Sequence, residues 1–188
     1  MRVVTATRRD VIVREGPFTR AERDALPDDG YRHELLDGML LMTPAPSTRH
    51  QDIVASLVIL LRRHAPRAAK VLVAPFDVAL GECTVLEPDV VVARRVDVTD
   101  ADLPGAPLLA VEVLSPSTRL FDLYRKRELL EAAGCPSYWV VDPAGPKLTA
   151  WELSDGRYAE VARVTGSESW TAQQPFPVTV TPVGLLDD

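Results

Sequence analysis

The sequence predicts a mixed α/β or α+β sandwich, in which two main helices lie on one β-sheet. Two continuous apolar runs, Val90-Val91-Val92 and Leu108-Leu109-Ala110-Val111, are typical of strands covered on both faces. Two further segments, residues 50–64 and 118–133, have the pattern of helices. At 188 residues the chain is long enough for one well-packed domain and short for two, so we expect a single domain over residues 1–188.

The N-terminal third combines a short helix, a hairpin and a long helix. Thr19-Arg20-Ala21-Glu22 is a capping box, which predicts a helix that ends near Leu26, before Pro27. Residues 31–42 carry Asp37-Gly38 at their centre and therefore predict a β-hairpin. The helix of residues 50–64 follows two prolines.

The rest of the chain alternates between strand and helix patterns. We expect strands at residues 71–80, 85–93, 108–114 and 137–142, and a hairpin of residues 147–153 and 158–164 that turns at Asp155-Gly156. The helix of residues 118–133 ends at Gly134. From Thr171 the chain is rich in proline, which predicts an irregular tail.

Composition and charge narrow the function classes. The apolar share of 46% and the charged share of 26% are those of an ordinary globular protein. The formal charge of −6 counts against a protein that coats bulk nucleic acid. It does not exclude a nucleic-acid enzyme, because a metal site gathers carboxylates and a basic stripe can lie on an acidic protein.

Nothing in the sequence indicates export or a membrane. The longest apolar run, residues 57–61, is far short of the roughly 18 residues that a membrane span needs. The N-terminus lacks the apolar core of a signal peptide. Cys83 and Cys135 are too few for a disulfide framework, so we expect two free thiols and a cytoplasmic location.

Two carboxylates lie inside apolar strand sequence. Asp89 precedes Val90-Val91-Val92, and Glu112 follows Ala110-Val111. A buried carboxylate needs a cation, a set of hydrogen bonds or a metal. Two such acids on neighbouring strands suit Mg²⁺, which prefers oxygen ligands. The alternative is that each acid points outward from a half-exposed strand.

A lysine lies within the apolar stripe of the second helix. On a helical wheel of about 100° per residue, Lys126 falls between Leu130 and Ala133. A lysine in that place extends to solvent, pairs with an acid or points into a site. The alternative is a helix ion pair with Asp122, four residues earlier.

Other polar residues have simpler interpretations. His50 opens the first long helix and is interpreted as a cap or a core residue. Glu34 lies in the first strand of the hairpin, and its simplest interpretation is an exposed strand residue. The sequence contains no glycine-rich phosphate loop, nucleophile elbow or zinc-spaced Cys/His cluster.

Taken together, these segments resemble the Uma-type endonuclease family of the PD-(D/E)xK restriction-endonuclease-like superfamily. The segments that carry the resemblance are Glu34-Leu35-Leu36-Asp37-Gly38, His50-Gln51, Pro88-Asp89-Val90-Val91-Val92, Val111-Glu112-Val113-Leu114-Ser115-Pro116-Ser117-Thr118, Asp122, Lys126 and Tyr138-Trp139-Val140-Val141-Asp142-Pro143. The resemblance implies a central mixed β-sheet flanked by helices and a phosphodiesterase site that depends on Mg²⁺ or Mn²⁺.

The resemblance also assigns residues. Asp89 and Glu112 match the two acids of the motif and would hold the metal, and Glu34 matches an additional early acid. The usual lysine two positions after the glutamate is replaced by Leu114. Lys126 resembles a relocated copy of that lysine, so the expected catalytic set is Asp89, Glu112, Lys126 and Glu34.

We therefore expect a metal-dependent endonuclease that hydrolyses nucleic acid, with DNA as the expected substrate and a homodimer as a plausible assembly for cutting duplexes. The alternative is a non-catalytic binding or assembly module that retains the fold. The acidic net charge and the missing Glu-x-Lys spacing favour this alternative. The set of two strand acids and an inward lysine favours the enzyme.

Overall fold

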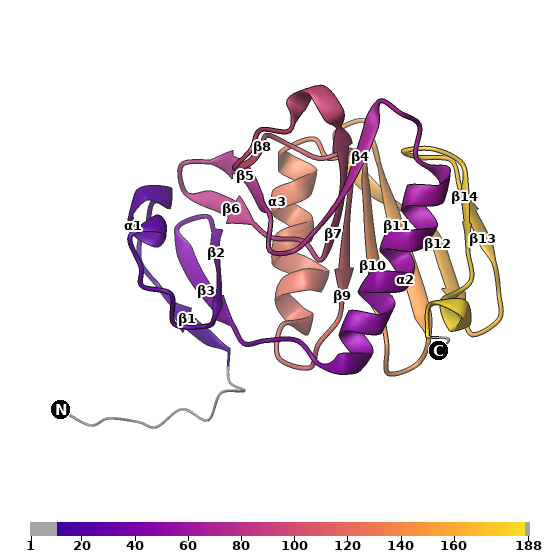
Figure 1. The fold of residues 1–188 in the computed structure, drawn as a ribbon, viewed down its shortest axis with the longest axis horizontal. Helices are drawn as coiled ribbons and strands as arrows, with labels where there is room; N and C mark the ends of the chain where they lie inside the picture. Colours follow the sequence, from indigo (N-terminus) through magenta and orange to yellow (C-terminus); the bar gives the residue numbers. More distant parts are fainter. Residues whose placement is uncertain (1–10, 187–188) are drawn as a thin grey trace.

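A computed structural model describes residues 11–186 of the chain and contains two six-stranded sheets (Figure 1). The first sheet has the order β1 (Ile12–Arg14), β3 (Met39–Thr43), β2 (Arg32–Leu36), β6 (Thr84–Leu86), β5 (Asp77–Gly81) and β8 (Asp102–Pro104). The second sheet has the order β12 (Arg157–Thr165), β11 (Lys147–Ser154), β10 (Ser137–Asp142), β9 (Leu109–Val113), β7 (Val90–Arg94) and β4 (Ala69–Val73).

Helices cover both faces of the second sheet. The helix α2 (Thr48–His64) packs Ile53 and Leu57 against one face. The helix α3 (Lys126–Ala132) packs Leu130 against the other face, where the apolar cluster also includes residues of the first sheet. Figure 1 accordingly shows α3 between the two sheets. The mixed α/β fold class is therefore confirmed, although the strands form two large sheets and not the single sheet that we expected.

Most predicted elements are present. The capping box of Thr19 begins α1 (Arg20–Asp24), and α2 begins two residues earlier than expected, after the N-cap Ser47. Both predicted hairpins form, and their turns have the positive φ angles that Asp-Gly pairs favour: 55° and 80° at Asp37 and Gly38, and 51° and 76° at Asp155 and Gly156.

Two of the predicted strands were wrong, because each is divided at a proline. The 71–80 segment divides at Pro75 into β4 and β5, and the 85–93 segment divides at Pro88 into β6 and β7. Proline has no N–H to donate to a ladder, so pairing ends there. In both segments the two halves belong to different sheets. Pattern analysis also missed the short strands β1 and β8.

The predicted irregular tail was also wrong. Residues after Ser169 form a two-stranded sheet of β13 (Trp170–Ala172) and β14 (Val178–Val180), followed by a 3-10 turn, η3 (Pro182–Leu185). Val178, Val180 and Leu185 are buried in the cluster beneath α2. The segment is ordered because its apolar residues complete that core.

The cysteines and the helices of residues 11–186 were also subjects of prediction. Both cysteines are free thiols, with Cys135 buried. Within this range no helix is long and apolar enough to cross a membrane.

Candidate active site

Asp89 and Glu112 lie on one face of the second sheet. In the antiparallel pairing of β7 with β9, Val90 is opposite Val111. Continuing this register by one residue brings Asp89 opposite Glu112, and residues opposite each other in a ladder share a face. Asp89 is 3% exposed and Glu112 is 1% exposed. The alternative that these acids point outward is therefore wrong.

Both acids line a cavity of about 1200 Å³. Arg32 from β2 and His50 from α2 also line it, and residues 114–119, after β9, form part of its wall. The cavity therefore brings together side chains from both sheets and α2.

Asp89 has three polar partners. Its Oδ1 lies 3.1 Å from Nη1 of Arg32 and 3.2 Å from Nε2 of His50, while its Oδ2 accepts a hydrogen bond of 2.8 Å from the backbone N–H of Val113. The backbone bond fixes the carboxylate beside the strand end that carries Glu112. His50 is thus a site residue, and its interpretation as a helix cap was wrong, because Ser47 caps α2.

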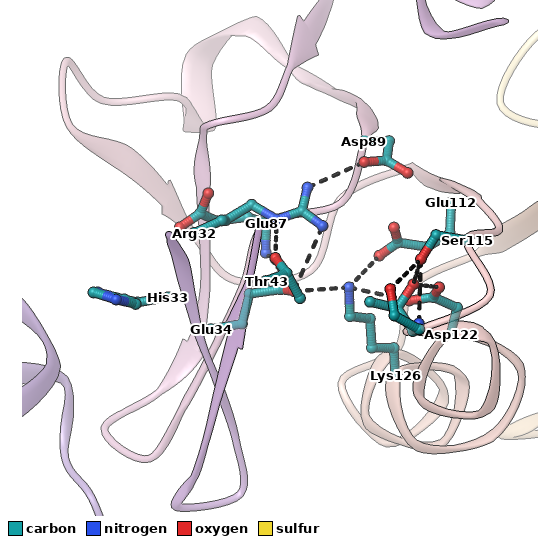
Figure 2. Close-up of polar contacts among 12 residues, drawn as sticks. Arg32, His33, Glu34, Thr43, Glu87, Asp89, Glu112, Ser115, Asp122 and Lys126 are labelled. Carbon is teal, nitrogen blue, oxygen red and sulfur yellow. Dashed lines mark hydrogen bonds and ion pairs between the residues drawn. The ribbon is translucent and has the colours of Figure 1, made fainter. Parts of the chain in front are cut away.

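The amine of Lys126 lies among three acids that we call, with the lysine, the Lys126 cluster. Nζ is 3.0 Å from Oε1 of Glu112, 3.0 Å from Oε2 of Glu34 and 3.3 Å from Oδ1 of Asp122 (Figure 2). The contact with Glu112 is a hydrogen bond, and the other two are ion pairs without hydrogen-bond geometry. The helix ion pair between Lys126 and Asp122 is therefore present. It is one of three contacts of the amine, and Lys126 is fully buried.

A widened helical turn places Asp122. Residues Phe121–Arg125 form a π-helical turn, η2, immediately before α3. The Asp122 carbonyl accepts a hydrogen bond of 2.7 Å from the Tyr138 hydroxyl, and its side chain accepts one of 2.7 Å from Thr118. Such turns widen a helix by one residue and frequently occur at functional sites. Here the turn leaves Asp122 and Lys126 facing the same cluster.

Glu34 reaches the cluster from the first sheet. It is fully buried, so its interpretation as an exposed strand residue was wrong. Its Oε1 accepts a hydrogen bond of 2.8 Å from the backbone N–H of Glu87. Its neighbour on the same strand face is Arg32, whose Nη2 lies 3.8 Å from Oε2 of Glu34. Arg32 was missed from the sequence, although strand alternation places residues 32 and 34 on one face.

Comparisons with known proteins identify the family of the chain and relate its fold to a solved structure. Residues 20–184 match the Uma2 family, described as "Putative restriction endonuclease". The chain belongs to this family. The solved structure titled "putative nuclease belonging to DUF820", from Anabaena variabilis, shares its fold, with a TM-score of 0.70 and 18% identity over 90% of this chain and 98% of that chain. No curated protein matches the chain.

In this Uma2 family member, burial and charge set the protonation of the two strand acids in opposite directions. Burial alone would raise the pKa of Asp89, but His50, Arg32 and the Val113 N–H together hold that pKa well below its usual range. Burial raises the pKa of Glu112 well above its usual range, although Lys126 opposes the rise. The nearby acids Asp122, Asp89 and Glu34 add to it.

Lys126 and Asp122 complete the electrostatic balance. Burial disfavours the charged amine, but Glu112, Glu34 and Asp122 raise the pKa of Lys126 well above its usual value, so the amine is protonated. Burial also raises the pKa of Asp122, against the effect of Lys126. The buried acids Glu34, Asp89, Glu112 and Asp122 thus lie beside only two cationic side chains, Lys126 and Arg32, so carboxyl groups outnumber cations at the site.

The donor set of the site bears on the expected Mg²⁺ or Mn²⁺ ion. Within residues 11–186 no group of three or more His, Cys, Asp or Glu side chains is arranged to hold a metal ion. The two expected ligands nevertheless line one cavity with carboxylate oxygens, and burial, followed by the neighbouring acids, raises the pKa of Glu112 against the effect of Lys126. Carboxylate oxygens that line one cavity are the donors that a hydrated Mg²⁺ or Mn²⁺ prefers, so the residues fit the ion.

Proposed function

We propose that this protein is a metal-dependent nuclease that hydrolyses phosphodiester bonds in nucleic acid. One observation carries the proposal: Asp89 and Glu112 face one large cavity from neighbouring strands, and a buried lysine amine contacts Glu112. A core built for stability alone would place apolar side chains at these positions, because buried ion pairs contribute little net stability.

Asp89 and Glu112 would hold the metal ion in this proposal. When bound, the ion would polarise the phosphate and lower the pKa of a water molecule. The Val113 N–H keeps Asp89 directed at the cavity, and Lys126 keeps Glu112 in place. Arg32 lines the same cavity and can neutralise charge that develops on the phosphate oxygens.

We assign Lys126 and Glu34 mainly to positioning. The Lys126 amine is buried among three acids, so direct action on water or phosphate would require one of these contacts to open. Glu34 holds the amine from the opposite side and links it to the backbone of Glu87. The substrate class in this proposal is nucleic acid, with DNA as the first to test. A homodimer would supply two sites for cutting a duplex.

The proposal is tested by metal binding and cleavage together. Mg²⁺ or Mn²⁺ should raise the thermal midpoint of the wild type, because a ligand of the folded state stabilises it by mass action. Asp89→Asn should abolish this rise and slow the cleavage of single-stranded and duplex substrates by about 100-fold or more, because loss of a residue that only supports a metal ligand already costs roughly 10–100-fold. Asp97→Asn is the matched control, because Asp97 lies just past the opposite end of β7.

The opposite result would favour a different function. The internal pairing of all four acids is also what a non-catalytic binding or assembly module would show. If metal produces no rise in the wild type, or an equal rise in Asp89→Asn, and no nucleic acid is cleaved, the nuclease proposal fails and the module becomes the better account.

A further inference from the structure

A second, smaller cavity adjoins the first. It has a volume of about 280 Å³ and lies over β10, β11 and β12 beside α3. Leu114, Arg119 and Asp142 line both cavities, so the two adjoin at the strand end that carries Glu112. A chain that passes the first cavity would therefore meet the second.

The second cavity is basic, in contrast to the acidic chain around it. Four basic side chains line it: Arg119, Arg127, Lys147 and Arg163. Only two acids do so, and both are paired, Asp142 with Arg119 at 2.8 Å and Glu160 with Arg163 at 2.6 Å.

Two of the four cations remain available for an anion. Across the described range 11–186, neither Arg127 nor Lys147 forms an ion pair with an acid. The guanidinium of Arg127 is instead held by aromatic rings, 5.1 Å from the centre of Trp151 and 5.9 Å from that of Tyr124. This stacking orients the guanidinium without using its N–H groups, which leaves them free to donate to phosphate oxygens.

An exposed aromatic ring completes the surface. The Tyr124 side chain is 57% exposed on the η2 turn and also lines the second cavity. Leu120, one turn earlier, is 70% exposed. Basic side chains beside an exposed aromatic ring are the combination that binds single-stranded nucleic acid, with the phosphate on the cation and the base on the ring.

The size of the cavity decides between a single strand and a duplex. Its volume of about 280 Å³ is at the small end of the range for ligand sites, so the cavity has room for at most one small unit such as a single nucleotide. Bases in a duplex are stacked on each other and do not offer a face to a side chain, whereas an unpaired base does.

We propose that the second cavity and the Tyr124 ring bind one unpaired nucleotide of the strand that leaves the first cavity, with its phosphate on Arg127 and Lys147. This inference rests on the proposed function, since the strand is the substrate of the first cavity. The phosphate and base chemistry is shared by DNA and RNA, and both are included in the test.

The test measures binding in EDTA, where no cleavage is needed, by the fluorescence anisotropy of short labelled single-stranded DNA, single-stranded RNA and duplex DNA. Wild type should bind a single strand more tightly than a duplex of the same sequence. Tyr124→Ala should weaken single-strand binding by about 10-fold, within the range for one lost base stack. Arg127→Gln and Lys147→Gln should each reduce the slope of log K against log salt by about 0.7, the value for one lost phosphate contact.

Matched variants separate charge from fold. Arg127→Lys and Lys147→Arg keep the charge and should keep the salt slope. Arg94→Gln removes an exposed arginine at the opposite end of β7 and should leave binding unchanged. Equal thermal midpoints for all variants would show that none has lost its fold.

The outcomes distinguish the nucleotide site from the nuclease proposal. If Tyr124→Ala, Arg127→Gln and Lys147→Gln bind as the wild type does, or the duplex binds as tightly as the single strand, the nucleotide site is overturned, while metal-dependent cleavage would still support the nuclease. If the three variants lose binding but the wild type cleaves nothing with metal, the nucleotide site stands and the nuclease fails. A wild type that neither binds nor cleaves overturns both.

Discussion

The two faces of the second sheet are equally buried, but only the face toward α3 adds a cluster of charged side chains to its apolar residues. Beneath α2 the sheet presents apolar side chains, among them Val111, Val113 and Trp139, each no more than 1% exposed. On the α3 side, the same strand β9 presents Glu112, which faces Lys126 and is equally inaccessible. Burial therefore does not distinguish the two faces, and the chemistry of what is buried does.

The difference in chemistry is also a difference in free energy. Burying an apolar side chain such as leucine contributes about 1.5–3 kcal/mol. Burying a charge costs several kcal/mol, which an ion pair recovers only when its geometry is good and its partners are complete. The α2 face thus stabilises the fold, whereas the buried charges on the α3 face depend on ion pairs that leave one oxygen of Glu34 and one of Asp122 without a hydrogen bond. A costly polar face that opens into a cavity is expected of a site that performs chemistry.

The largest expected effect comes from removing the shared cation. Lys126→Met keeps the apolar stem but leaves Glu34, Glu112 and Asp122 without their amine, so the free energy of unfolding should fall by about 3–5 kcal/mol at pH 8. The loss should shrink as the pH falls toward 5, because a carboxyl whose folded pKa is raised destabilises the fold only above its unfolded pKa. Urea unfolding at both pH values measures this.

An apolar substitution on the other face is the matched control. Leu57→Ala should cost about 2–5 kcal/mol, with the same loss at pH 5 and at pH 8, because no titratable group is involved. The double variant Lys126→Met/Glu112→Gln should recover part of the stability that Lys126→Met loses. A pH-independent loss in Lys126→Met would remove the distinction between the two faces.

A smaller effect is expected at Glu87, which lies beside Glu34. Burial, followed by the charge of Glu34, raises the pKa of Glu87 to about 7. Because the folded pKa exceeds the unfolded one, this group makes the fold less stable as the pH rises from about 4.5 to 7. Glu87→Gln should therefore increase the free energy of unfolding by about 1–3 kcal/mol at pH 8 and change it little at pH 4.5. A gain that is equal at both pH values would contradict this assignment.

The smallest expected effect concerns the hydrogen bond that supports the widened turn. Tyr138→Phe removes the hydroxyl that donates to the Asp122 carbonyl and should cost about 1–2 kcal/mol. Tyr158→Phe removes a comparable bond of 2.9 Å, to the Cys135 carbonyl, away from the Lys126 cluster. Both variants should lose stability, but only Tyr138→Phe should also slow cleavage. Equal cleavage by the two would show that the bond to Asp122 supports the fold alone.

Local patterns were enough to predict much of the fold. The capping box at Thr19, the Asp-Gly turns and the apolar runs around Val91 and Val111 depend on a few neighbouring residues, and each formed as expected. The assignment of β5 and β6 to a separate sheet depends on contacts between distant segments. Such contacts leave no local period, so the sheet to which each half belongs could not be predicted, although Pro75 and Pro88 were local signals of a break.

The residues of the candidate site also differ in whether a local sequence pattern revealed them. Asp89 and Glu112 could be found because each interrupts an apolar strand, and Lys126 because it interrupts an apolar helix face. Glu34 looked like an exposed strand residue until the first sheet was placed against α3. Asp122 could be seen only as a helix partner, because a regular helical wheel does not include the π-helical turn.

The Lys126 cluster also has a consequence for the order in which the protein becomes active. Its acids come from β2, from β9 and from the turn before α3, so the cluster requires both sheets to be formed and docked. Contacts between such distant parts of the chain form slowly, since a long loop must close first. A chain that has folded only its N-terminal hairpin has Glu34 but lacks Glu112, Asp122 and Lys126. Competence for cleavage would thus be among the last properties that the chain acquires, which would keep incomplete molecules from damaging nucleic acid.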